Sequence, residues 1–159
     1  MRDLPAVGIV ATCFIYMIAG VYLGANPAVV IGPVIGAVIV TIAVRAVRQR
    51  ARIRRFHQHR AAGRYPQAAQ IAQAMISQLA DGETDRTDTV AAERQRADLY
   101  GWYLNLSYVQ YEAGDRAAVD SAAVAVAGMR ELFGPWHPDT ITAQHFHDSA
   151  STTFTTQNE

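Results

Sequence analysis

Three features of the sequence predict an all-α protein in two parts, an N-terminal transmembrane hairpin of two helices and a C-terminal series of helix pairs. Residues 4–44 contain no charged side chain. The next twenty residues, 45–64, carry eight arginines and no acidic residue. From residue 65 onward, apolar side chains recur with the 3.6-residue period of an amphipathic helix, and no stretch keeps the alternation of a strand.

The transmembrane hairpin is predicted over residues 1–47. Segments 4–24 and 28–44 each approach the roughly 20 apolar residues with which a helix crosses a bilayer, and only three residues separate them. A cleaved signal peptide is the alternative for the first segment. Against it, Arg2 is offset by Asp3, the apolar run is long, and a second apolar run follows at once.

Small residues four apart occur in both predicted spans, and such pairs let helix backbones approach closely. They are Gly20 and Gly24 in the first span and Gly32 and Gly36 in the second. Three interpretations stay open: glycine is common in membrane helices, the two spans pack tightly on each other, or the glycines contact another membrane subunit. No ionisable residue lies within 4–44, which argues against an ion or proton pathway.

A basic juxtamembrane helix is predicted over residues 48–64. Because arginine beside a span keeps that side in the cytoplasm, we expect a multi-pass protein of the inner (cytoplasmic) membrane with both termini inside. Residues 45–62 contain no Gly or Pro, so we expect the second span to continue into this helix without a break. One stripe along the continuous helix would meet anionic lipid headgroups, or would serve only to set topology; it consists of Arg45, Arg48, Arg52 and Arg55. Ile53 and Phe56 lie elsewhere on the circumference, where they could dock on the soluble part.

Charge is divided between the two halves of the chain. Residues 1–64 hold nine arginines and one aspartate, net +8, and residues 65–159 hold five arginines and thirteen acids, net −8. The acidic half argues against nucleic acid as a partner, because such binding needs a basic face.

The soluble domain is predicted over residues 65–150 as antiparallel helices with a polar tail at 151–159, which would cap the domain or be disordered. Gly63 and Gly114 are typical of helix C-termini, Pro66 of a first turn, and Asp115 of a cap. Apolar stripes mark a core face in three helices. These stripes are Ala68, Ile71, Ala72, Met75, Ile76 and Leu79; then Leu99, Trp102, Tyr103, Leu106 and Val109; then Val119, Ala122, Val126, Met129 and Phe133.

The turns between these helices resemble those of tetratricopeptide repeats. Residues 63–69 (GRYPQAA) and 114–119 (GDRAAV) resemble the turn within a repeat, and 134–140 (GPWHPDT) is similar to the inter-repeat joint of the kinesin-light-chain-like subclass common in bacteria. The resemblance covers about residues 50–150. The 51-residue spacing exceeds the usual ~34 residues, Ser107 and Val119 replace the usual Gly and Ala, and the third repeat lacks its second helix. Membrane tethering, a partner or self-association into a homo-oligomer would complete so short a solenoid.

The resemblance implies recognition of a protein or peptide and no chemistry of its own. Aromatic side chains on the helix near residue 100 are the candidate contacts, because exposed aromatics are favoured in protein recognition. Those on the side away from the predicted core stripe are Tyr100, Tyr108 and Tyr111. Packing between helices is the alternative role for each of them.

No motif for catalysis, a cofactor or a metal is found in the sequence. Cys13 is the only cysteine, and phosphate loops, nucleophile elbows and His-Glu-x-x-His motifs are absent. His145 and Asp148 share a helix face, but His147 points elsewhere, and residues 137–139 are accounted for by a helix start. We therefore expect a non-enzymatic, membrane-anchored interaction module that recruits or positions a protein at the inner leaflet. The alternative is a small structural or accessory subunit of a larger membrane complex.

Overall fold

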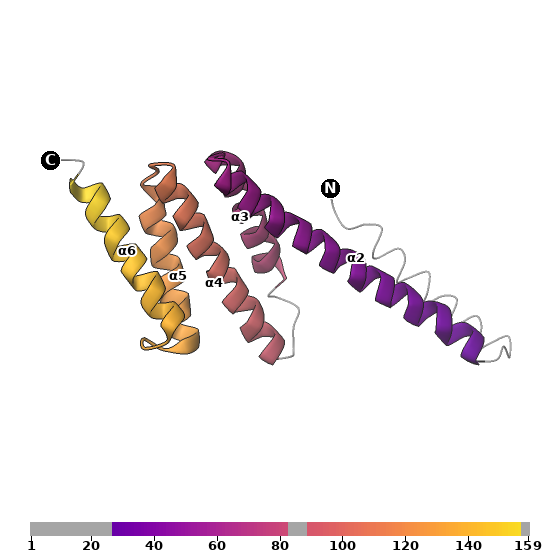
Figure 1. Ribbon diagram of the computed structural model, residues 1–159. Coiled ribbons are helices and arrows are strands. Elements are labelled where there is room, and N and C mark those ends of the chain that lie inside the picture. Colours follow the sequence, from indigo (N-terminus) through magenta and orange to yellow (C-terminus); the bar gives the residue numbers. More distant parts are fainter. Residues whose placement is uncertain (1–26, 83–88, 157–159) are drawn as a thin grey trace. The chain divides into compact units, whose positions relative to one another are not determined.

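The computed structural model describes residues 27–82 and 89–156, and in these ranges it consists of helices and turns without a strand (Figure 1). The prediction of an all-α protein is therefore confirmed. The helices are α2 (Pro27–Ala61), α3 (Tyr65–Asp81), α4 (Thr89–Glu112), α5 (Ala117–Phe133) and α6 (Pro138–Thr156).

The chain divides into two compact units, Met1–Ile53 and Arg54–Glu159. Helix α2 contributes to both. The second unit thus begins inside the segment 48–64 that the sequence predicts as a basic juxtamembrane helix. The reason is Phe56, whose side chain is fully buried and meets the ring of Trp102 edge to face, with centroids 5.3 Å apart.

In the described part of the first unit, α2 is unbroken from Pro27. Across the described residues, none of the helices has a stretch that is both long enough and apolar enough for a membrane crossing. The predicted first span, residues 4–24, lies outside the described residues, and so do Gly20 and Gly24.

The helix ends at Gly63 and Gly114 have the same backbone geometry. Both glycines have positive φ, 67° and 73°, which side chains with a Cβ rarely adopt. In each turn the glycine N–H donates to the carbonyl three residues earlier at 3.0 Å, and the next N–H donates to the carbonyl five residues earlier at 2.8 Å. This pair of bonds is the Schellman motif, which satisfies carbonyls that a helix end leaves without partners. The two turns similar in sequence are therefore equivalent in structure.

Proline or aspartate residues mark the starts of three helices, α3, α5 and α6. Pro66 lies in the first turn of α3 and Pro138 begins α6, where the missing N–H costs nothing. At α5, an Asp115 carboxylate oxygen accepts the N–H of Ala117 at 2.9 Å. The aspartate thus satisfies an N–H of the first turn, although it lies one residue before the cap position.

The core of the second unit lies between successive helices, since α3 packs on α4, α4 on α5, and α5 on α6 (Figure 1). Most members of the predicted stripes are buried. Ile71, Leu79, Tyr103 and Val119 are only partly buried and Phe133 is exposed. Helix α5 is slender on its inner side, where Ala118, Ala122 and Ala125 are fully buried.

Two buried glutamines join neighbouring helices. The Gln95 amide on α4 donates to the carbonyl of Leu79 on α3, and the Ser121 hydroxyl on α5 donates to the Gln110 side-chain oxygen at 2.7 Å. Each bond gives a buried polar group its partner, which such groups require.

The predicted polar tail is helical through Thr156, because Phe154 is buried with 7 % exposure. Packing of this side chain against its neighbours favours the helix, although the threonines of the segment are poor helix formers.

Thr140 offers a test of the α6 packing. Its side chain is fully buried, and its hydroxyl has no hydrogen-bond partner among the described residues. We expect Thr140→Val to raise the free energy of unfolding by about 1 kcal/mol, because valine keeps the shape and removes the unsatisfied group. Urea unfolding measures the change. Thr142→Val is the matched control: Thr142 is exposed and bonds the Pro138 carbonyl at 2.8 Å, so a change within about 0.5 kcal/mol is expected. Destabilisation by Thr140→Val would contradict the assignment.

Candidate functional site

Four aromatic side chains from α4 and α6 form a continuous row within the second unit, which we call the aromatic strip: Tyr108, Tyr111, Phe146 and Phe154. The ring centroids of Tyr108 and Phe146 are 4.2 Å apart. Tyr111 meets Phe146 at 5.6 Å and Phe154 at 5.8 Å, both nearly perpendicular. Such pairs contribute about 0.5–1.5 kcal/mol each beyond area burial. The strip thus joins two helices that are not consecutive in the chain.

A charged pair from α2 and α4 lies beside the strip. The Arg60 guanidinium binds the Glu112 carboxylate through two nitrogens, with Nη2–Oε1 at 2.6 Å and Nε–Oε2 at 3.0 Å. The same guanidinium lies 5.5 Å from the centroid of the Tyr108 ring, a cation–π arrangement. The hydrogen bond to Glu112 raises the pKa of Arg60 above its ordinary value. One side of the strip therefore carries an ion pair, whose guanidinium lies over the Tyr108 ring and is held in place by the Glu112 carboxylate.

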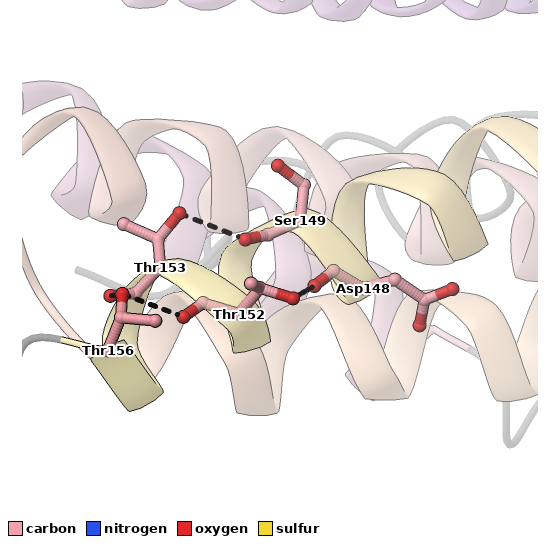
Figure 2. Close-up of a pocket in the computed structure, with 5 residues that line it drawn as sticks. All are labelled: Asp148, Ser149, Thr152, Thr153 and Thr156. Atoms are coloured by element: carbon pink, nitrogen blue, oxygen red, sulfur yellow. Dashed lines mark hydrogen bonds between the residues drawn. The ribbon is translucent and has the colours of Figure 1, made fainter.

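The face of α6 next to the strip is lined with hydroxyl groups. A shallow pocket there is bordered by Asp148, Ser149, Thr152, Thr153 and Thr156 (Figure 2). Figure 2 shows that three threonine hydroxyls donate back to carbonyls of the same helix, at distances of 2.9, 3.0 and 3.2 Å.

The Thr153 hydroxyl also lies 3.2 Å from the hydroxyl of Tyr111. Because these hydroxyls already donate within α6, the pocket offers mainly acceptors and a polar surface.

The three predicted tyrosines separate into two groups. Tyr108 and Tyr111 lie in the strip and are half-buried. Tyr100 instead packs between α4 and α5 beside Val126 and Met129, and a Cβ built on Gly128 would lie 2.2 Å from its ring. Tyr100 therefore fills a helix contact, the alternative role that the sequence analysis left open.

The predicted lipid-contacting arginines all lie on α2 with exposed side chains; these are Arg45, Arg48, Arg52 and Arg55. Gly36 has no described atom within 4 Å of the position that a Cβ would occupy. Gly32 lies in α2. The structure describes the side chains of this helix only from residue 35 onward, so the packing at Gly32 lies outside the described part.

The histidines of α6 make contacts that do not form a ligand set. Among the described residues, no group of three His, Cys, Asp or Glu side chains is placed to hold a metal. His147 Nδ1 lies 3.2 Å from an Asp148 carboxylate oxygen, and the Gln144 amide donates to the same oxygen at 2.8 Å. These two hydrogen bonds hold the pKa of Asp148 below its usual value. His137 Nδ1 accepts the N–H of Asp139 at 3.3 Å. The His137 ring stacks on the ring of Phe133.

Sequence reasoning missed part of the strip and the charged pair, namely Phe146, Phe154, Arg60 and Glu112. One signal was available: Phe146 and Phe154 are eight residues apart, a spacing that places two side chains on the same side of a helix.

No model of a known protein family, no curated protein sequence and no solved structure matches this chain. The functional argument therefore depends on the residues themselves.

Proposed function

We propose that this protein is a membrane-anchored interaction module that recruits or positions a partner protein at the inner leaflet. The observation that carries the proposal is the aromatic strip with Arg60 beside it. Half-buried tyrosines and an arginine are the residue types that contribute most to protein–protein binding energy. Tyr108 offers both an aromatic ring and a hydroxyl, and its ring is already within reach of a cation.

The resemblance to tetratricopeptide repeats supports the same proposal. The two equivalent glycine turns and the parallel pairing of α4 with α6 agree with a helix-pair solenoid, in which alternate helices share one face. In this interpretation the strip is where a peptide or protein segment would lie.

Support for the anchor comes from the N-terminal half of α2. Between residues 35 and 47 the exposed large apolar side chains are 41–65 % exposed, and those at consecutive positions 38–40 already cover more than half of the helix circumference. A helix that is apolar on all sides is suited to a membrane or a large core. The exposed residues are Ile35, Val38, Ile39, Val40, Ile42, Val44 and Val47. The arginines that follow suit the anionic inner leaflet.

Partner binding is tested with the full chain. Crosslinking in native membranes and mass spectrometry identify a stoichiometric partner, and pull-down in detergent then measures its retention. Tyr108→Ala is expected to weaken binding by about 2 kcal/mol, roughly 30-fold in Kd, as for a binding hot spot. Tyr111→Ala and Phe146→Ala should weaken it in the same direction.

Tyr103→Ala is the matched control, because Tyr103 is a half-buried tyrosine of the same helix outside the strip. Its partner retention should match the unmodified chain. Equal retention in Tyr103→Ala, Tyr108→Ala and Phe146→Ala would count against the strip as a binding surface.

An accessory subunit of a larger membrane complex is the second candidate, favoured by Gly36, whose Cβ position has no atom of the described residues within 4 Å. The same pull-down separates the two candidates. If the partner is held by glycine packing, Gly36→Leu releases it and the strip variants do not.

A further inference from the structure

Gly101 lies in the middle of α4, where glycine weakens a helix relative to alanine. No described atom outside the helix's own backbone lies within 4 Å of the position that its Cβ would occupy. Every other described glycine of the second unit either has positive φ or has a side chain close to its Cβ position. These glycines are Gly63, Gly114 and Gly134, with positive φ, and Gly82 and Gly128, whose Cβ positions approach Gln95 and Tyr100. Gly101 therefore lowers helix stability without serving a described contact.

The position of Gly101 connects it with the aromatic strip. Gly101 precedes Tyr108 by seven residues, close to two helical turns, so the two lie on the same face of α4. They are about 10 Å apart along the helix axis, at roughly 1.5 Å per residue. Both are half-buried. The surface that carries Tyr108 thus continues along α4 to a place where no side chain covers the helix backbone.

The polar groups at the Tyr108 end of this face favour an uncharged acceptor. The Tyr111 hydroxyl lies 3.2 Å from that of Thr153, but among the described residues the Tyr108 hydroxyl has no hydrogen-bond partner. Arg60, beside the Tyr108 ring, is already neutralised by Glu112. A carboxylate ligand would therefore lie close to a like charge, which is unfavourable. A main-chain carbonyl oxygen is an acceptor without that charge.

The absence of a Cβ at position 101 favours the main chain of the partner as well. Two backbones can approach closely only where side chains do not separate them, and glycine permits such an approach. Inside a helix the carbonyls are bonded within the helix and side chains surround the backbone. A helical partner would therefore bring neither a free carbonyl to Tyr108 nor its main chain to Gly101.

An extended segment meets both conditions. It rises about 3.3 Å per residue, so roughly four residues cover the distance from Gly101 to Tyr108. We propose that the strip binds an extended segment of a partner protein, with the segment's main chain against α4 at Gly101 and one of its carbonyl oxygens accepting from the Tyr108 hydroxyl. This inference rests on the proposed function, because it takes the strip as the binding surface.

The probe is a random library of short linear peptides displayed on phage and selected on the full chain in mild detergent. Peptides are kept if they bind the unmodified chain and fail to bind Tyr108→Ala. Their Kd is then measured by fluorescence polarisation. Gly101→Ala is expected to raise the Kd on the order of tenfold, because the added methyl overfills a close contact. Urea unfolding should show this variant to be at least as stable as the unmodified chain, so the loss of binding is separate from folding.

The main-chain hydrogen bond is tested from both sides. Tyr108→Phe keeps the ring and removes the hydroxyl, and we expect the Kd to rise roughly fivefold, as for one lost hydrogen bond. Synthetic versions of a selected peptide carry an ester in place of one amide at a time, which weakens that carbonyl as an acceptor. One ester position should raise the Kd for the unmodified chain and leave the Kd for Tyr108→Phe unchanged.

Ala127→Leu is the matched control, since Ala127 is exposed on α5 and its enlargement should leave the Kd unchanged. A library that yields no Tyr108-dependent peptide contradicts the strip as a binding surface, and this inference with it. Tyr108-dependent peptides that bind Gly101→Ala as tightly as the unmodified chain contradict the inference alone. An ester scan in which no position changes the Kd also overturns it, in favour of recognition through side chains.

Discussion

Phe56→Ala is expected to lower the free energy of unfolding of the second unit by about 3–5 kcal/mol, the cost of truncating a fully buried phenylalanine. The Phe56 ring has no exposed surface, and it meets Trp102 and His57 at centroid distances of 5.3 Å. Truncation therefore removes an apolar contact between α2 and α4. Urea unfolding of the full chain in mild detergent, followed by circular dichroism, measures the loss.

Arg55→Ala is the control for Phe56→Ala. Arg55 is the preceding residue in the same helix, its side chain is exposed, and its replacement should change stability by no more than about 0.5 kcal/mol. Phe56→Leu should fall between the two variants. A loss below about 1 kcal/mol for Phe56→Ala would mean that residues 54–61 are not part of the folded unit.

Gly128→Ala should destabilise the protein, although alanine normally favours a helix over glycine by about 1 kcal/mol. A Cβ at position 128 would lie 2.2–2.3 Å from three atoms of the Tyr100 ring. To relieve this clash, α4 and α5 must separate or the Tyr100 ring must leave its site, and either change costs about 1–3 kcal/mol. The net change measured by urea unfolding is therefore expected to have the opposite sign to helix propensity.

Gly101→Ala is the matched comparison in the neighbouring helix. Gly101 lies within α4, and no described atom is within 4 Å of its Cβ position. We expect this variant to be more stable by about 0.5–1 kcal/mol. Tyr100→Ala combined with Gly128→Ala should show a coupling energy of about 0.5–3 kcal/mol, because removal of the ring removes the clash. A Gly128→Ala protein as stabilised as Gly101→Ala would show that Tyr100 does not lie over position 128.

Local signals in the sequence were sufficient to place most helix boundaries. Gly63 and Gly114 end helices because they adopt positive φ, and Pro138 starts one because it needs no N–H partner. The helix through Thr156 was not predicted, because its threonines suggest a loop or cap. Burial of Phe154 outweighs that preference.

Only the α4 side of the candidate site was predictable from the sequence. Tyr108 and Tyr111 could be assigned to a face of α4 from their spacing. Phe146, which contacts both, is more than thirty residues further along the chain, and Arg60 is about fifty residues before. The spacing of residues within α4 cannot predict these contacts, because they depend on which helices become neighbours in the folded chain.

The sequence by itself determined the all-α class, the turn geometry at two glycines and the core face of each helix in the second unit. These features follow from interactions over one or two helical turns, which residue type and spacing decide. Tertiary structure alone decided that Tyr100 is a packing residue while Tyr108 and Tyr111 belong to the strip, and that Phe56 lies in the folded unit. Each of these depends on the pairing of helices distant in sequence, where side-chain shape and burial select the partner.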